Sequence, residues 1–387
     1  MGLAVGLAGC AAGFFSHSKI STDTAGKRAI YGFILFFIAA VFISNVFSPD
    51  PSTSFNRYRV FVGEIAMFLL VLCLRYDGER GFTGLFLKVF MMFAAVEAVY
   101  GITEFIIGIK HYTTSDGLFN PVYRITGTLG HYNSIGGVLG MVLPIFFAFA
   151  VYKKTNGDKQ WYLYAAGILA VFACIILTST RGAWMGIVSG LTVMFVVRKR
   201  KLLLIPALLL ALIIALPQSR ARLFQTIMKP DIARLLIWES GIDMVKEKPL
   251  LGWGQDTFKE IFYQRYATSE KVKKIIREKS DFVLELDGKY FHAHNIFLCI
   301  MQESGFTGFF TFLFILAAIF SRLFAVLKGS FGQWEKAVAW GILGLTVDFL
   351  VHGLVDNTLR GETAYIFWFM AGLLYLFPEE TEGKGLS

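Results

Sequence analysis

Residues 161–197 read WYLYAAGILAVFACIILTSTRGAWMGIVSGLTVMFVV, in which two apolar runs flank a short polar turn at Arg181. A helix needs roughly 20 apolar residues to cross a hydrocarbon core about 30 Å thick. Comparable apolar runs recur along the chain, and they lack the polar stripe that amphipathic helices of soluble enzymes carry. The pattern predicts an all-α polytopic membrane protein and excludes a soluble Rossmann-type enzyme.

The composition of the 387 residues agrees with this prediction. Hydrophobic residues make up 55% of the chain and charged residues only 17%, whereas a soluble domain carries about 25% charged residues. The four cysteines lie inside apolar runs without partners at metal-ligand or disulfide spacing, which predicts buried thiols. In a membrane protein, the positions of the basic residues along the chain explain a net charge such as the +9 found here. We therefore expect no nucleic-acid partner.

About 11–12 transmembrane helices are expected. The apolar segments are 2–15, 29–47, 60–74, 83–107, 135–152, 161–178, 183–197, 202–216, 296–320, 337–354 and 363–377. The first segment is short, which suggests that the natural chain begins earlier. We divide the chain into N-terminal transmembrane helices (1–123), a second transmembrane domain (124–377) that includes a long loop (217–293), and a tail (378–387).

Alternate connections differ in charge. One set, which includes the run Arg198–Lys201, holds 15 basic residues, and the other set of short loops holds 6. The positive-inside rule makes the richer set and the tail cytoplasmic, so that the loop 217–293 lies on the outer face. Within this loop, Asp231 can cap a helix that ends near Lys248. The amphipathic stretch 257–279 fits either a helix at an anionic membrane surface or a solvated cap on the bundle.

Ionisable residues inside membrane segments are expensive and therefore candidates for function. Those found here point to the outer boundary of the membrane, under the long loop: Glu64, Glu97, Glu104, Arg181, His294, Asp348, His352 and Asp356. The last three are spaced four residues apart, so they share one helix face. Alternatively, the glutamates and His352 satisfy neighbouring helices, and Arg181 is an interfacial anchor.

An anionic ligand at the outer surface suits these residues. Arg181 and Arg234 offer planar, bidentate donors that match phosphate oxygens. A histidine nearby suits a base that acts on a hydroxyl group. The outer loops carry no Asp-x-Asp cluster, so we expect a metal-independent mechanism, without a cofactor, in which arginine stabilises a leaving diphosphate.

The motifs resemble those of the O-antigen ligase superfamily, which also contains O-antigen and exopolysaccharide polymerases. His294-Asn295, nine residues and then Gly305-Phe306-Thr307-Gly308 is similar to its His-Asn-x9-Gly-x-x-Gly signature. We attribute the two glycines to the close approach of another helix. Three further stretches resemble other motifs of the superfamily and follow one another in the same order as those motifs. They are Arg124–Asn133, Thr180–Ala183, and Arg234–Trp238 followed by Pro249–Gly254.

The resemblance implies a C-type glycosyltransferase fold in the bacterial inner membrane, with the site facing the periplasm. The donor would be a glycan on undecaprenyl diphosphate, and the acceptor a hydroxyl of lipid A-core or of a growing glycan. The implied catalytic residues are His294, as base or acceptor-positioning group, and Arg181. The implied substrate-binding residues are Arg234, Arg124, Asn295, Asp356 and His352. We assign no role to His292, which on a helix would point away from His294.

Three function classes follow. The leading hypothesis is a ligase that joins glycan to lipid A-core. The alternative is a polymerase or a protein-glycosylating ligase, whose motifs overlap with those of the ligase. A lipid or glycan transporter is disfavoured, because transporters place polar sites near the bilayer midplane between repeats, whereas the charges here gather at the outer edge and no internal repeat is visible.

Overall fold

The computed structural model describes residues 24–378 except 75–76, 80, 110–111, 115–121, 218, 221–222, 224–231, 267–268, 271–272 and 275–291. The first predicted membrane segment, 2–15, lies outside the described residues, as does the predicted helix cap Asp231. The ten later apolar segments each coincide with a helix. These helices are α2 (Thr24–Val46), α3 (Pro51–Leu72), α4 (Phe82–Ile106), α5 (Tyr132–Thr155), α6 (Trp161–Leu177), α7 (Arg181–Val197), α8 (Leu204–Ala215), α13 (Ile296–Lys328), α14 (Gln333–Gly353) and α15 (Gly361–Leu376).

The predicted all-α polytopic membrane fold is confirmed. Within the described residues, α2, α4, α5 and α13 are long and apolar enough to cross a membrane, and α6 and α7 are shorter apolar helices. The departure from pure helix is small: β1 (Tyr112–Thr114) pairs antiparallel with β2 (Val122–Arg124).

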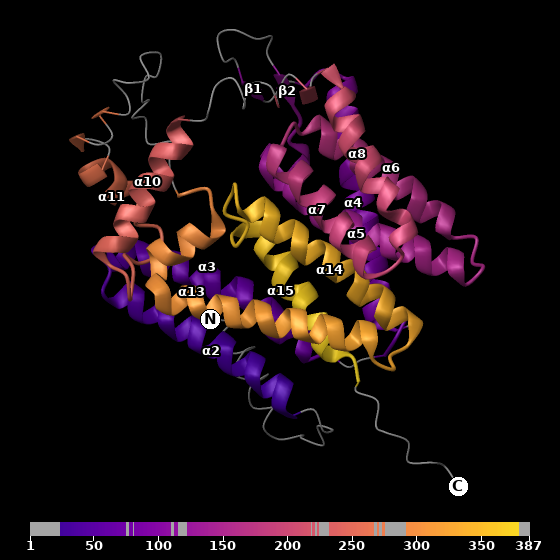
Figure 1. Cartoon of the computed structure of the whole chain (residues 1–387), viewed down its shortest axis with the longest axis horizontal. Helices are drawn as coiled ribbons and strands as arrows, with labels where there is room; N and C mark the ends of the chain where they lie inside the picture. The colour runs from indigo at the N-terminus through magenta and orange to yellow at the C-terminus, as the bar shows by residue number, and fades with distance from the viewer. Residues whose placement is uncertain are drawn as a thin grey trace.

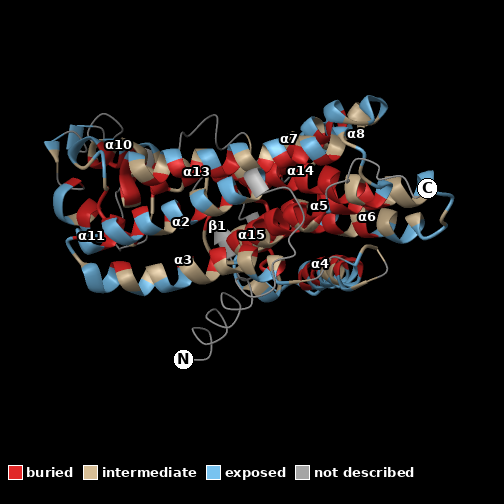
Figure 2. Ribbon diagram, turned by 90° about the horizontal axis from the view of Figure 1, so that it is seen from below, coloured by how far each residue is buried: buried red, intermediate tan, exposed pale blue. Residues whose placement is uncertain are grey.

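The core of the bundle lies around α14. This helix packs against α5 and α7 on one side and against α13 on the other, while α15 packs on α3 and α2 packs on α13 (Figure 1). Of the apolar membrane-spanning stretch, 83% is buried in α5 and 33% in α4. Figure 2 shows the same division: buried residues concentrate on the central helices, and exposed ones cover the outer faces of the peripheral helices. Many large apolar side chains are exposed on these helices, as lipid contact requires.

Glycines allow α7 to approach α14 closely. Gly182, Gly186 and Gly190 recur every fourth residue, so they share one face of α7. A Cβ atom on Gly186 would lie 2.5 Å from Oδ1 of Asp348, and one on Gly190 would lie 2.5 Å from the carbonyl oxygen of Gly344. Small residues at such an interface let two helix backbones meet, as in other membrane bundles.

Gly186→Ala is therefore expected to destabilise the bundle by about 1–3 kcal/mol, the usual cost of overpacking. Thermal unfolding in detergent measures the loss. Gly32→Ala on α2 is the matched control, because a Cβ there meets no atom within 4 Å. Adding Asp348→Ala should restore part of the stability by removing the clashing oxygen. An unchanged melting temperature for Gly186→Ala would contradict this packing.

Several of the basic connections meet at one end of the bundle. Lys153, at the end of α5, pairs with Glu79 at 2.9 Å, and Arg198, after α7, donates to Oε1 of Gln333 at 3.1 Å. Helices α5 and α7 run from the opposite end, where α13 and α15 also begin. This alternation matches the predicted topology, while the side of the membrane that each end faces stays a prediction.

The long connection carries helical structure of its own. Helix α10 (Ile232–Glu247) agrees with the predicted helix, and α11 (Phe258–Ile261) continues into a π-helical turn, Phe262–Tyr266. Phe258, Ile261 and Phe262 are at most 5% exposed and pack with residues of α10 and the start of α13. Residues 258–266 are thus a cap packed on the bundle, whereas residues 267–268, 271–272 and 275–279 of the predicted stretch lie outside the described residues.

Helix α13 is broken at Gly305, and a loop fills the break. Gly305 has φ 63°, in the left-handed region that glycine tolerates. The loop Pro249–Gly254 docks there: the N–H of Trp253 donates to the carbonyl of Gln302 at 2.7 Å, and the N–H of Phe306 donates to the carbonyl of Pro249 at 2.7 Å. A Cβ on Gly305 would lie 2.2 Å from the carbonyl oxygen of Leu250. The predicted close approach is therefore made by a loop rather than by another helix.

Candidate active site

A polar cleft of about 480 Å³ opens at the end of the bundle where α5, α13 and α15 begin. Four of the six histidines of the chain line it. The lining residues are His131, Tyr132, Asn133, Ser134, His292, His294, His352, Asp356, Asn357, Thr358, Arg360, Glu362 and Thr363. The structure thus brings His294, His352 and Asp356 together in one cleft.

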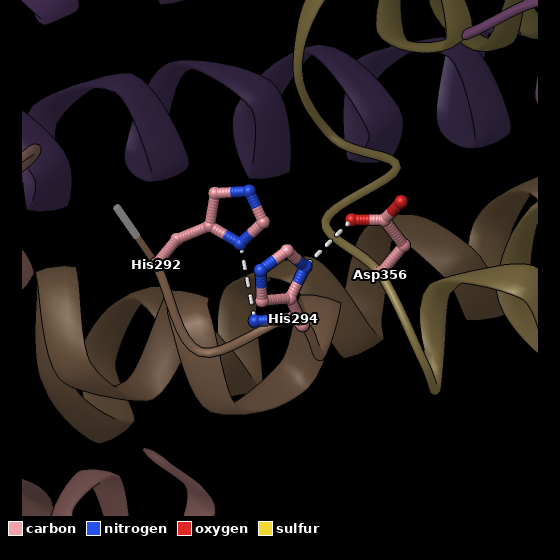
Figure 3. Close-up of side chains that lie close together, drawn as sticks. All are labelled: His292, His294 and Asp356. Atoms are coloured by element: carbon pink, nitrogen blue, oxygen red, sulfur yellow. Dashed lines mark hydrogen bonds and ion pairs between the residues drawn. The ribbon is translucent and has the colours of Figure 1, made fainter. Parts of the chain in front are cut away.

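His294 and Asp356 form a direct pair. Nδ1 of His294 lies 3.2 Å from Oδ1 of Asp356 (Figure 3). The carboxylate also accepts the backbone N–H of Asn357 on Oδ1 and the side-chain amide of Asn133 on Oδ2, both at 2.8 Å. Burial opposes the charge of Asp356, but the hydrogen bond to His294 and the nearby imidazoles hold the pKa of Asp356 below its usual range. Asp356 is therefore an anion that orients the His294 ring.

His292 does not point away from His294, which corrects the expectation from helix geometry. Both histidines precede α13, and their ring centroids lie 4.2 Å apart. Nδ1 of His292 accepts the backbone N–H of His294 at 3.1 Å (Figure 3). Burial lowers the pKa of His292 to about 3, so its imidazole is neutral near pH 7.

Asn295 fixes the start of α13. Its side-chain oxygen accepts the N–H of Leu298 at 3.0 Å, which makes it the N-cap of the helix. Its amide nitrogen donates to the carbonyl of Leu354 at 3.1 Å, just after α14. The resemblance implied substrate binding for Asn295, and in the structure its side chain caps α13.

The motif Arg234–Trp238 lies on α10, beside the segment that carries His292 and His294. Nε1 of Trp238 donates to the carbonyl of Ala293 at 2.9 Å, which ties α10 to the residue before His294. Arg234 lies one turn earlier on α10. It is half-buried and within electrostatic range of His352. The motif therefore joins α10 to the cleft.

Arg124 supports the turn that precedes Arg181. Nε of Arg124 donates to the carbonyl of Thr178 at 3.0 Å, and one of its terminal nitrogens donates to the carbonyl of Ser179 at 3.1 Å. Ser179 has φ 52°, so this turn occupies a sparsely populated conformation that its neighbours must hold. The guanidinium of Arg124 stacks 3.2 Å from the Tyr132 ring centroid and is only 5% exposed. Arg124 thus contacts the protein scaffold of the site.

Arg181 is the first residue of α7 and is partly exposed. Its neighbour Gly182 lies against His352, since a Cβ on Gly182 would be 2.9 Å from Nε2 of that ring. One turn deeper on α14, Asp348 is fully buried, and neither of its oxygens has a hydrogen-bond partner among the described residues. The prediction that all three share one helix face is wrong for Asp356, because α14 ends at Gly353. His352 and Asp356 line the cleft, and Asp348 lies beneath it.

The three helical glutamates have partners in the scaffold. Glu104 accepts the N–H of Gly127 at 2.8 Å, and Glu97 accepts the N–H of Thr128 at 2.7 Å, so α4 pins the loop that leads into α5. Glu64 pairs with Arg57 at 2.8 Å and accepts the N–H of Gly361 at 2.9 Å. These contacts agree with the alternative that the glutamates serve neighbouring elements.

Among the cleft residues that were not assigned from the sequence, Arg360 and Asn133 bond charged side chains of the site. Arg360 lines the cleft and bonds the carboxylates of Asp256 and Glu303. Its signal was its position at the start of the last apolar segment, on the same side as His294. Asn133 was part of a quoted motif, but its partner Asp356 lies 223 residues away, a contact that local pattern does not reveal.

One group of described residues has the chemistry of a metal site. His292, His294 and Asp356 can place one ligand atom each within 4.8 Å of one another. Imidazole and carboxylate are ligands that zinc accepts. However, Nδ1 of both rings and Oδ1 of Asp356 already take part in hydrogen bonds, so a metal would need the remaining Nε2 atoms or replace these bonds. No metal site was predicted from the sequence, and metal removal tests that expectation.

The fold and the cleft define a multi-pass membrane protein with a polar site at one end of its helix bundle. Residues 165–313 match the O-antigen ligase family. Over 378 residues the chain is 23% identical to the exopolysaccharide production protein ExoQ of Rhizobium meliloti (strain 1021). This match covers 92% of this chain and 79% of ExoQ. These matches confirm the resemblance of this chain to the O-antigen ligase and polymerase superfamily.

Proposed function

We propose that this protein transfers a glycan from undecaprenyl diphosphate to an acceptor hydroxyl, at the periplasmic face of the bacterial inner membrane. The observation that carries the proposal is the His294–Asp356 pair, 3.2 Å apart in a cleft at the end of the bundle. A histidine oriented by a carboxylate, here the half-buried Asp356, is the arrangement by which enzymes make imidazole a base toward a hydroxyl.

In the proposed reaction, Nε2 of His294 removes the proton of the acceptor hydroxyl. The acceptor oxygen attacks the anomeric carbon of the donor sugar, and the bond from that carbon to the diphosphate oxygen breaks. The diphosphate leaves with the bonding electron pair and remains on the lipid. The proton stays on His294, where the negative charge of Asp356 stabilises the imidazolium until it is released to water.

The surroundings of the cleft favour a diphosphate. Helices α5, α13 and α15 begin at its walls, and α7 begins beside His352. The N-terminal end of a helix carries partial positive charge and unpaired N–H groups, which attract phosphate. Arg181 and Arg234 add full charges near His352, and we assign them to the diphosphate. Arg124 and Asn295 then act as positioning residues for the turn before Arg181 and for the His294 segment.

The two candidate functions differ in the acceptor that receives the glycan. A ligase would use lipid A-core, and a polymerase would use the growing glycan. The similarity to an exopolysaccharide production protein over 92% of the chain favours keeping the polymerase as the second candidate. A deletion strain separates them: long lipid-linked chains that fail to reach the surface indicate a ligase, and single repeat units capped on lipopolysaccharide indicate a polymerase.

The transfer reaction itself is tested with purified enzyme, undecaprenyl diphosphate-linked glycan and each acceptor in turn. Release of undecaprenyl diphosphate together with the extended acceptor is the expected result. We expect EDTA to leave the rate unchanged. Strong inhibition by EDTA, reversed by added Zn²⁺, would instead assign a metal to His292, His294 and Asp356.

Arg181→Lys is expected to lower transfer by about 10²-fold or more while the protein inserts and folds normally. Lysine keeps the charge but loses the planar fork that binds a diphosphate bidentately, and removal of one stabilising donor typically costs about 10²–10³-fold. The rate with purified variant and donor measures the effect. An interfacial anchor would tolerate lysine, which also snorkels, so a fully active variant would argue against a diphosphate at Arg181.

A further inference from the structure

We infer that His292 is a positioning residue that holds His294 in its working conformation through the backbone. The inference rests on the proposed function of His294 as the base. Nδ1 of His292 accepts the N–H of His294 at 3.1 Å, and this bond links the side chain of residue 292 to the backbone of residue 294. Figure 3 shows the two bonds in series, from His292 to the His294 backbone and from the His294 ring to Asp356.

The backbone of His294 needs such support. Its φ is 47°, in the left-handed region that residues other than glycine rarely occupy. A conformation of this kind persists only where surrounding contacts determine it, and it concentrates at functional sites. In an ordinary extended backbone, the His294 side chain would leave the cleft on a different vector and lose the 3.2 Å contact to Asp356.

The neighbouring backbone groups are fixed by other residues, which leaves His292 one distinct task. Trp238 holds the carbonyl of Ala293 at 2.9 Å, and the side chain of Asn295 begins α13. Neither bond reaches the N–H of His294. The contact from a side chain at position i to the N–H at i+2 is also the one that Asn and Asp make in Asx-turns, so an imidazole takes the place of a short polar side chain here.

The protonation state of His292 matches this task. An imidazole accepts a hydrogen bond on Nδ1 only when that nitrogen carries no proton. The backbone N–H of His294 lies 3.1 Å from Nδ1 of His292, so this nitrogen is the unprotonated one. The lone pair of Nδ1 is therefore engaged by the backbone, which leaves the role of base to His294.

Two substitutions separate positioning from simple packing. His292→Asn keeps an acceptor that reaches the N–H two residues on, and His292→Leu keeps bulk without an acceptor. We expect His292→Leu to lower kcat by about 10–100-fold with the KM for the donor unchanged, since a small displacement of a catalytic group costs up to about 10²-fold. His292→Asn should stay within about threefold of the wild type, because the N–H of His294 keeps its partner.

Amide hydrogen exchange at His294, followed by mass spectrometry, gives a readout that does not depend on activity. His292→Leu should speed exchange of this N–H, and His292→Asn should keep it protected. Circular dichroism and thermal unfolding confirm that both variants fold. Equal kcat values for leucine and asparagine, or equal protection in both, would overturn the inference. If wild-type enzyme lacks transfer activity, the proposed function fails, and the exchange measurement alone then decides the role of His292.

Discussion

His294→Ala is expected to lower the rate of glycan transfer at least about 10²-fold, the smaller end of what general-base catalysis contributes. The acceptor hydroxyl has a pKa far above neutrality, so its attack depends on proton removal, and the His294 ring lies in the cleft with its Nδ1 on Asp356. Binding of the lipid-linked donor should persist, because Arg181 and Arg234 lie on other elements. Initial rates and donor binding with purified enzyme measure both effects.

His294→Gln separates the two roles that the sequence left open for His294. Glutamine can hydrogen-bond a substrate but cannot take up a proton at neutral pH. If His294 is the base, the glutamine variant should be as inactive as the alanine variant. If His294 only positions the acceptor, glutamine should recover much of the rate. Activity of His294→Ala within about threefold of the wild type would exclude both roles, since general-base catalysis implies at least ~10²-fold.

The positions of the membrane helices were predictable because one physical requirement determines their sequences. A segment that crosses hydrocarbon must satisfy its backbone internally and present apolar side chains to lipid, so run length alone identifies it. The segment 161–178, for example, coincides with α6 (Trp161–Leu177) to within one residue. Outside the apolar runs the pattern is weaker. The stretch 257–279 allowed a membrane-surface helix, yet Phe262 is fully buried against the protein, because packing against α10 and α13 offered its apolar face a partner.

The composition of the cleft was predictable only in part. His294, His352 and Asp356 come together because α13 begins and α14 ends at the same end of the bundle, which the alternation of the membrane segments predicts. The supporting contacts depend on three-dimensional packing between distant segments. Arg124 looked like a ligand for phosphate, whereas its bonds to the turn at Thr178 and Ser179 span more than 50 residues.

The backbone at the site was the least predictable feature. A helical register for residues 292 and 294 separates their side chains, but the chain leaves that register before α13 begins. No sequence pattern predicts the φ of 47° at His294, because residues other than glycine occupy the left-handed region only in a few per cent of cases. The break at Gly305 had a visible glycine, and what remained hidden was its partner, the loop Pro249–Gly254.

Asp356→Asn is expected to reduce transfer by about 10³–10⁴-fold, the scale of the same exchange in a serine protease triad. Asp356 accepts hydrogen bonds on both oxygens, from His294 and Asn357 on Oδ1 and from Asn133 on Oδ2. An asparagine carries one oxygen and one amide nitrogen. Its NH2 group must therefore replace one of the two carboxylate oxygens and point its N–H groups at donors that had bonded to that oxygen. If the amide nitrogen faces His294, Nδ1 of the ring becomes an acceptor and its proton moves to Nε2, where a base needs a lone pair.

A double-mutant cycle tests whether Asp356 acts through His294. Rates are measured for His294→Ala, Asp356→Asn and the combination in purified enzyme that binds donor normally. Residues that act as a unit are strongly non-additive, so Asp356→Asn should have little further effect once His294 is alanine. Asn133→Ala serves as the graded comparison, because it removes one hydrogen bond at 2.8 Å from Asp356 but leaves the carboxylate, and it should cost much less. Full additivity of His294→Ala and Asp356→Asn would separate the two residues and assign Asp356 to substrate rather than to the histidine.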